Sequence, residues 1–134
     1  MHIDGGCHCG ALAYEAEIDP DNVTICHCTD CQQLSGSVFR VAVRARVADF
    51  RLLRGEPSVY VKRGGSGEDR PQAFCSSCSS QIYSASVGAD AMFIRIRLGS
   101  CRQRAELKPR AQIWCDSSIP WLADLDRIDK RPGA

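Results

Sequence analysis

The chain has 134 residues, of which 25% are charged and 44% are hydrophobic. At about 150 residues per domain, this length predicts a single domain spanning residues 1–134 and excludes a large multidomain enzyme. Seventeen basic and sixteen acidic side chains leave a formal net charge of +1. Because this balance supplies no global field, we expect neither nucleic acid nor a membrane surface as a partner.

The start of the chain, Met1 to Gly6, has no basic region followed by an apolar one, and no run of about eighteen apolar residues occurs anywhere. The sequence therefore predicts neither a secretory signal nor a membrane span, and we expect a cytoplasmic protein. Its nine cysteines exceed what packing needs, and a reducing compartment does not keep thiols paired as disulfides. The cysteines need another explanation.

The first half of the chain predicts short strands. Apolar and polar residues alternate over 12–18, and a turn at 19–22 leads to a second strand at 23–28, so the pair is predicted to form a hairpin. A turn or two of helix is expected at 29–34. Apolar residues then alternate with arginines over 39–47, which predicts a half-buried strand.

The second half continues the β pattern and ends in a helix. Further strands are predicted at 58–62, 81–85, 94–98 and 111–115, and the glycine-rich stretch 63–67 is predicted to be a mobile loop. A short helix is predicted at 120–128, where apolar residues recur at helical spacing after Pro120. The whole is a mainly β fold of short antiparallel strands with one or two short helices.

The arginines that alternate along two of these strands have two interpretations. They could form bidentate contacts with the carboxylates of a ligand, but arginines at alternate strand positions usually make a solvated face, and we expect the latter. The residues concerned are Arg40, Arg44, Arg46, Arg95 and Arg97.

Seven of the nine cysteines fall into three tight groups. Cysteines two apart in an extended segment, or three apart on a turn, can direct both sulfurs to one point, and such pairs are typical of tetrahedral zinc sites. Disulfides are less favoured because the cysteine count is odd and no export signal is present. An iron–sulfur cluster ranks lower still because its cysteine runs are spaced differently. The groups are Cys7 and Cys9; Cys26, Cys28 and Cys31; and Cys75 and Cys78.

Seven thiols cannot complete two closed sites of four ligands each. Structural zinc has four protein ligands, whereas catalytic zinc keeps three and leaves one position open. The natural partition gives a structural site that joins the start of the chain to its middle, and an open site within the second group. Spacing alone leaves other partitions possible, in which His27, Asp30, Cys101 or Cys115 completes the second site. Otherwise we expect His8, His27 and Asp30 to point away, and Cys101 and Cys115 to serve packing.

Four ordered motifs resemble those of the glutathione-dependent formaldehyde-activating family of zinc proteins, which have a β-tent fold. The resemblance spans nearly the whole chain, with Ser79 and Gln112 standing where that family usually has glycine and often has histidine. It implies a structural zinc at Cys7, Cys9, Cys75 and Cys78, and a second, catalytic or exchangeable zinc at Cys26, Cys28 and Cys31. The motifs are Gly6-Cys7-His8-Cys9-Gly10, Cys26-His27-Cys28-Thr29-Asp30-Cys31 followed by Ser35-Gly36, Phe74-Cys75-Ser76-Ser77-Cys78, and Pro120-Trp121.

The resemblance also implies an activity of the carbon–sulfur lyase class, like that of an S-(hydroxymethyl)glutathione synthase. Its partners would be a small thiol, typified by glutathione, and an aldehyde, typified by formaldehyde. Three thiolates make zinc a weaker Lewis acid than three imidazoles do, so we favour thiol binding over water activation as the role of the open position. The alternative is a zinc-stapled β interaction module without catalysis, which would require a fourth protein ligand at the second site.

Overall fold

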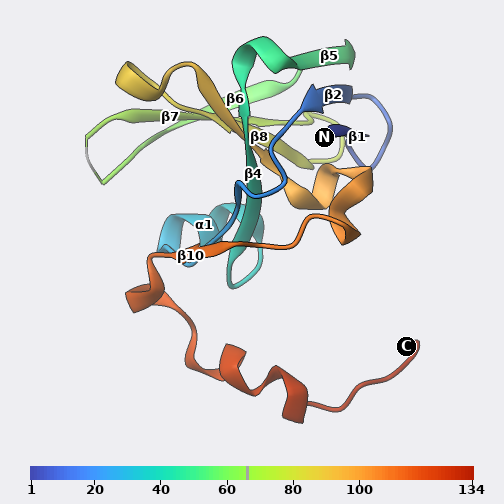
Figure 1. Cartoon of the computed structure of the whole chain (residues 1–134), viewed down its shortest axis with the longest axis vertical. Coiled ribbons are helices and arrows are strands. Elements are labelled where there is room, and N and C mark those ends of the chain that lie inside the picture. Colours follow the sequence, from blue (N-terminus) through green and yellow to red (C-terminus); the bar gives the residue numbers. More distant parts are fainter. Residues whose placement is uncertain (66) are drawn as a thin grey trace.

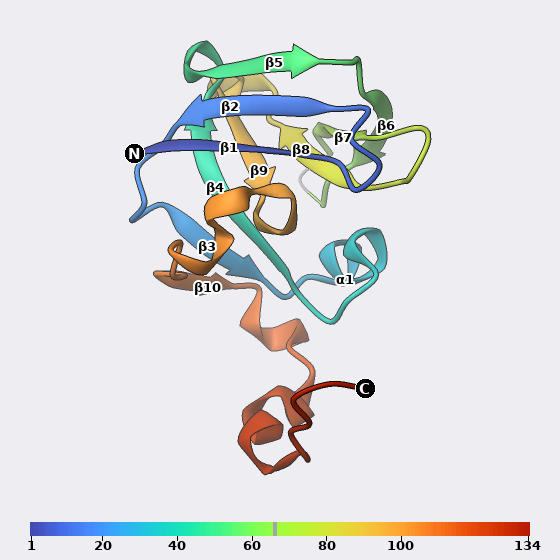
Figure 2. The same cartoon turned by 90° about the vertical axis from the view of Figure 1, so that its right-hand side faces the viewer.

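The computed structural model describes residues 1–65 and 67–134 and consists of two β-sheets. The smaller sheet has the strand order β1 (His2–Gly6), β2 (Ala13–Glu17) and β5 (Phe50–Arg54), with antiparallel pairing throughout. It forms the upper layer in Figure 2, where β5, β2 and β1 run side by side above the larger sheet.

The larger sheet has seven strands. Adjacent strands in it are antiparallel except at one edge, where the last strand of the chain is parallel to its neighbour. The two strands of this edge are labelled β10 and β3 in Figure 2. The described residues therefore form the mainly β fold predicted from the sequence. The strand order is β10 (Ala111–Ile113), β3 (Val23–Cys26), β4 (Arg40–Arg46), β9 (Phe93–Arg97), β8 (Gln81–Ala85), β7 (Asp69–Phe74) and β6 (Ser58–Arg63).

Helical structure is confined to short segments. The α-helix α1 (Thr29–Ser35) follows β3, as predicted, and ends at Gly36, whose positive φ of 66° closes the C-terminal turn. The remaining segments are 3-10 turns: η1 (Val47–Asp49), η2 (Gly88–Asp90), η3 (Leu98–Ser100), η4 (Arg102–Ala105), η5 (Cys115–Ser117) and η6 (Pro120–Arg127).

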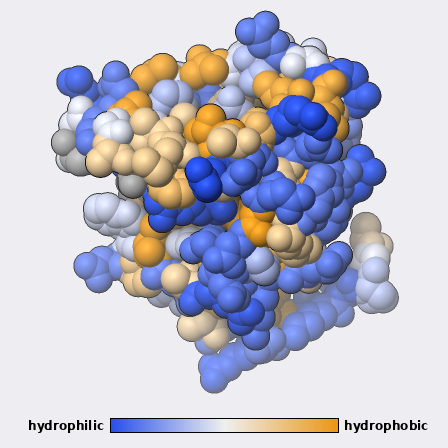
Figure 3. All heavy atoms as spheres, turned by 45° about the horizontal axis from the view of Figure 1, so that its top comes forward, coloured by the Kyte–Doolittle hydropathy of each residue, from blue (hydrophilic) through white to orange (hydrophobic). Residues whose placement is uncertain are grey.

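The hydrophobic core combines side chains from both sheets. Ile3 and Tyr14 enter it from the smaller sheet, and Val43, Ile82 and Ile96 from the larger one; each is at most 1% exposed. On β4 and β9 the apolar residues are buried at alternate positions, as the sequence pattern predicted. In Figure 3 the hydrophobic residues on the outer face shown form separate patches among hydrophilic ones.

The predicted hairpin between 12–18 and 23–28 is wrong. The strand β2 pairs with β1 and β5, whereas β3 pairs with β4 and β10 in the other sheet. A turn begins at Asp19, whose carbonyl accepts from the Asn22 N–H at 3.0 Å, and it carries the chain between the sheets. Alternation specifies which face of a strand is buried but not which strand it pairs with.

The expectation of a solvated arginine face is wrong for Arg40 and Arg97. They are 6% and 8% exposed, whereas Arg46 on the same strand as Arg40 is exposed. Both buried guanidinium groups donate hydrogen bonds to the side chain of Gln72 on β7. The pattern of alternation did not reveal these partners, because they lie far away along the chain.

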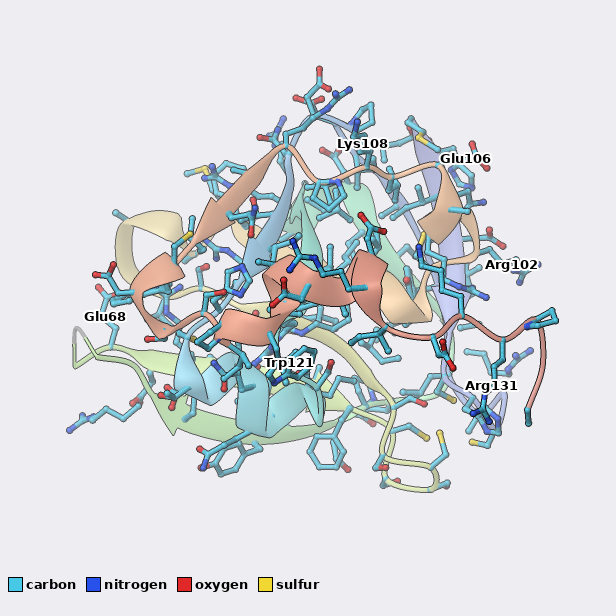
Figure 4. All side chains as sticks on the ribbon, turned by 90° about the horizontal axis from the view of Figure 1, so that it is seen from below. Glu68, Arg102, Glu106, Lys108, Trp121 and Arg131 are labelled. Carbon is cyan, nitrogen blue, oxygen red and sulfur yellow. The ribbon has the colours of Figure 1, made fainter. Side chains whose placement is uncertain are left out.

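The C-terminal segment is helical near the predicted place, as the 3-10 helix η6. Its Trp121, Leu125 and Ile128 are each about half exposed, and the segment leaves the body of the molecule in Figures 1 and 2. Figure 4 shows it from below, with Trp121 labelled. No helix in the described ranges is long and apolar enough to cross a membrane. The predicted mobile loop at 63–67 includes residue 66, which lies outside the described residues.

Candidate metal centres

Two turns from distant parts of the chain bring the first four cysteines together. Cys7 and Cys9 follow β1 in a turn closed by the Gly10 N–H and the Cys7 carbonyl at 3.2 Å, with Gly10 at a φ of 82°. Cys75 and Cys78 lie in the turn between β7 and β8. The four Sγ atoms all lie within 4.8 Å of one another, so this part of the predicted grouping is brought together by the fold.

The spacing of these sulfurs suits a tetrahedral ion. The Sγ of Cys9 lies 3.6 Å from that of Cys7 and 3.7 Å from that of Cys75. A zinc ion bound to sulfur at about 2.3 Å would set the tetrahedral edge at about 3.8 Å. All nine cysteines are free thiols, so the close approach of these sulfurs reflects no disulfide.

Hydrogen bonds support thiols of this first cluster. The Leu12 N–H donates to Cys7 Sγ at 3.2 Å, and the Ser80 hydroxyl lies 3.3 Å from Cys78 Sγ. The Ser80 hydroxyl and the backbone N–H groups of Cys9 and Ser80 lower the pKa of Cys78 to about 5. A hydrogen bond from Ala11 lowers the pKa of Cys9, but the sulfurs of Cys7 and Cys78 outweigh it and raise that pKa to about 11. These hydrogen bonds favour the thiolate form of Cys78, and a cation bound among the four sulfurs would favour the thiolate form of the others as well.

The second cluster is local. Cys26 ends β3, Cys28 is the N-cap of α1, and Cys31 lies in the first turn of that helix. The Cys28 sulfur accepts a hydrogen bond from the Cys31 N–H at 3.3 Å. The three Sγ atoms lie within 4.8 Å of one another, because the β3–α1 junction turns the chain back on itself.

The second cluster favours one negative charge and opposes a second one. The neighbouring Cys26 sulfur and burial raise the pKa of Cys31, while the charge of Arg40 opposes this. The Cys31 thiol in turn lowers the pKa of Cys26. Soft, closely spaced thiols with this mutual repulsion suit zinc or another thiophilic dication as a ligand set.

The side chains between these ligands point away, as expected. Asp30 pairs with Lys62 Nζ at 2.6 Å. His27 is 3% exposed, with Nε2 at 2.8 Å from Gln112 Oε1 and its ring edge-on to Phe39. His8 is exposed and adds no ligand atom to the four-cysteine cluster.

No further ligand joins the trio in the part of the chain that the structure describes. Among the described residues, no other histidine, cysteine, aspartate or glutamate places a ligand atom together with the sulfurs of Cys26, Cys28 and Cys31. Cys101 is 1% exposed in the core, as predicted, whereas Cys115 is exposed. The packing role expected for Cys115 is therefore wrong, because η5 lies on the surface beyond the last strand.

An open groove of about 1380 Å³ runs along the body beside the four-cysteine cluster. Cys7, Cys78 and Phe74 line it, and it extends to Arg40, Gln72 and Arg97. Cys26, Cys28 and Cys31 do not line it, but residues 33–35 of α1 and the two arginines do. The sequence analysis did not identify Gln72 as a residue of this region. The two arginines lie on strands with apolar alternation, and this pattern was the signal in the sequence that placed them near the core.

Comparison with known proteins agrees with this geometry. The glutathione-dependent formaldehyde-activating enzyme family matches residues 2–117, a range that contains all seven clustered cysteines but not the Pro120–Trp121 pair. A crystal structure of a Rhodobacter sphaeroides protein, a structural genomics target, has the same fold, with a TM-score of 0.64 at 20% identity over 81% of this chain and 98% of that one. The chain belongs to the glutathione-dependent formaldehyde-activating enzyme family.

Proposed function

We propose that the protein is a zinc-dependent enzyme of the carbon–sulfur lyase class that reversibly adds glutathione to formaldehyde. The observation that carries the proposal is the contrast between the two clusters: four sulfurs gather at one, and three at the other. Four thiolates close a structural site, and three leave a position for an exchangeable ligand.

The roles of the seven cysteines follow from this contrast. Cys7, Cys9, Cys75 and Cys78 would hold one zinc ion, and Cys26, Cys28 and Cys31 would hold the other. Zinc at the second site would supply Lewis acidity that lowers the pKa of an incoming thiol toward neutrality. The donor set fits this role better than water activation, because three thiolates already give the ion much electron density.

The chain's own groups then position the reactants. The trio fixes where the glutathione sulfur arrives, and the groove offers room for the rest of the tripeptide. The thiol releases its proton to solvent, and the sulfur electron pair forms a bond to the carbonyl carbon as the C=O π bond breaks. The carbonyl oxygen then takes a proton from solvent, which gives the S-hydroxymethyl adduct. Holding both reactants in one place supplies much of the rate increase.

The interaction-module alternative has less support. It requires a fourth protein ligand at the second cluster, and none lies there among the described residues. The proposal keeps the chain as a single domain of the β-tent type, since both sheets contribute to one core. It also places the enzyme in the cytoplasm, where thiols stay reduced.

The test is formation of S-(hydroxymethyl)glutathione from glutathione and formaldehyde by the zinc-loaded protein. We expect acceleration over the uncatalysed rate, and a fall to that rate in Cys31→Ser with its fold retained by circular dichroism. Cys115→Ser removes an exposed thiol outside both clusters and should keep full activity. A zinc-loaded wild-type protein that leaves the uncatalysed rate unchanged would contradict the proposal.

A further inference from the structure

Two buried arginines share a single amide oxygen beside the second cluster. The Gln72 Oε1 atom accepts from Arg40 Nη1 at 3.0 Å and from Arg97 Nη2 at 2.8 Å. The Gln72 amide nitrogen donates to the Arg70 carbonyl at 2.9 Å, which fixes the oxygen toward the two guanidinium groups. The arrangement holds two positive charges together around a neutral group.

These charges have no carboxylate partner within the described ranges. The ion pairs of the structure involve other arginines, and the Nε atoms of Arg40 and Arg97 have no hydrogen-bond partner. Taking a charge out of water is costly unless an opposite charge compensates it. Burial first, and then the charge of Arg40, lower the pKa of Arg97 to about 9.

The nearby groups able to supply negative charge are the thiols of the trio. Arg40 lies directly opposite Cys26 in the β3–β4 register, and Arg97 lies opposite Ala42, two residues further along β4. Residues two apart on a strand face the same side, so both arginines lie on the face that carries Cys26. Their charges act on Cys31, and that of Arg97 acts on Cys26 as well.

Charge balance indicates which fourth ligand of the second site this arginine pair would stabilise. Three thiolates around a dication carry one negative charge, and a fourth thiolate raises this to two. A neutral water or an imidazole as fourth ligand would leave one of the two arginines uncompensated. Two buried guanidinium groups therefore match four sulfurs around the ion better than three.

The geometry points to Arg40 and Arg97 as positioning residues that stabilise an anionic thiolate as the fourth ligand of the Cys26–Cys28–Cys31 site, with Gln72 holding the pair in place. This inference rests on the proposed function, and deepens it by assigning the selectivity of the open position to residues outside the metal ligands. The pair acts on the incoming sulfur through the electrostatic field, without itself forming a bond to it.

The test measures thiol binding with Co²⁺ in place of zinc, through the sulfur-to-cobalt charge-transfer absorption that a new thiolate adds. The probe is 2-mercaptoethanol, which has no carboxylate, with glutathione as a second arm. Arg97→Gln, which removes the charge, should weaken binding of both thiols by about tenfold, the effect of losing one charge at short range. Arg97→Lys, which keeps the charge, should restore most of the affinity.

A matched control and a second variant complete the design. Arg46→Gln, on the exposed end of β4, changes the net charge equally and should leave the affinity unchanged. Gln72→Glu keeps both arginines but places a carboxylate between them, and it should weaken thiol binding by a similar factor. Thermal melts and cobalt stoichiometry of each variant establish that the fold and both metal clusters persist, and Gln72→Glu stands in if Arg97→Gln does not fold.

The outcomes separate this inference from the function on which it rests. If wild-type and all folded variants bind both thiols equally well, the inference is overturned while the function stands. If only glutathione binding is weakened, the arginines bind a carboxylate of the ligand and the inference is likewise overturned. If the cobalt-loaded wild-type protein binds neither thiol, both the inference and the proposed function fail.

Discussion

At the scale of single residues, Gly5 shows how closely the segments around the first cluster approach each other. It lies in β1, two residues before Cys7, and pairs with Cys101 through an isolated bridge. A Cβ atom at this position would lie 2.1 Å from the Ser100 carbonyl oxygen and 2.6 Å from Tyr14 Oη. The absence of a side chain is therefore required for β1 to enter the core.

Replacing Gly5 with alanine should lower the free energy of unfolding by about 1–3 kcal/mol, because the methyl group would force the backbone of η3 away from β1. Gly99→Ala is the matched control, since a Cβ there meets no atom within 4 Å and its φ lies outside the left-handed range. Urea denaturation of both variants is the measurement. Equal stability of the two would show that the close approach at Gly5 relaxes without cost.

The same scale shows what residue patterns can predict about the site. The spacing of the cysteines predicted which thiols lie close together within each tight group, because short-range geometry decides this. Spacing alone left open which of these groups share one ion. The role of Arg40, Arg97 and Gln72 was not predicted, since their hydrogen bonds join strands 25 and 32 residues apart. Strand alternation reports burial on average and cannot identify an arginine that finds a polar partner inside.

At the scale of elements, the strands were easier to predict than their partners. The alternation over 39–47 located β4 well, because a half-buried strand imposes its period on the sequence. The strand predicted at 81–85 coincides with β8. The sequence pattern predicts a hairpin at the turn after β2, whereas in the structure this turn connects the two sheets. Pairing depends on contacts across the whole chain, which a local pattern does not contain.

The C-terminal segment η6 is expected to contribute little to the stability of the fold. In η6 no residue is buried, and the family match ends before it. Truncation after Ile119 should change the free energy of unfolding by at most about 0.5 kcal/mol and leave metal content unchanged.

A longer truncation provides the comparison. Removal of residues 111–134 also deletes β10, which pairs with β3 and whose Ile113 carbonyl accepts from the His27 N–H at 3.0 Å. This variant should be clearly destabilised, because β3 leads directly into the second cluster. Thermal melts with metal analysis test both variants, and a large loss from the shorter truncation would contradict this account.

At the scale of the whole molecule, the four-cysteine cluster joins segments that are distant in sequence. Cys9 and Cys75 lie 66 residues apart along the chain, and their sulfurs are 3.7 Å apart. A metal ion bound there would close a long loop and couple its binding free energy to folding. The second cluster closes only the β3–α1 junction, so we expect that a metal ion bound there would exchange without unfolding the sheets.

The central claim is that one metal ion is enclosed by four cysteines while another is held by three with an exchangeable fourth ligand. A crystal structure of the zinc-loaded protein, with data collected at the zinc absorption edge, tests it most directly. We predict two anomalous peaks, one surrounded by Cys7, Cys9, Cys75 and Cys78, and one bound by Cys26, Cys28 and Cys31 together with a ligand from solution. A single peak, or a protein side chain completing the second site, would contradict the account.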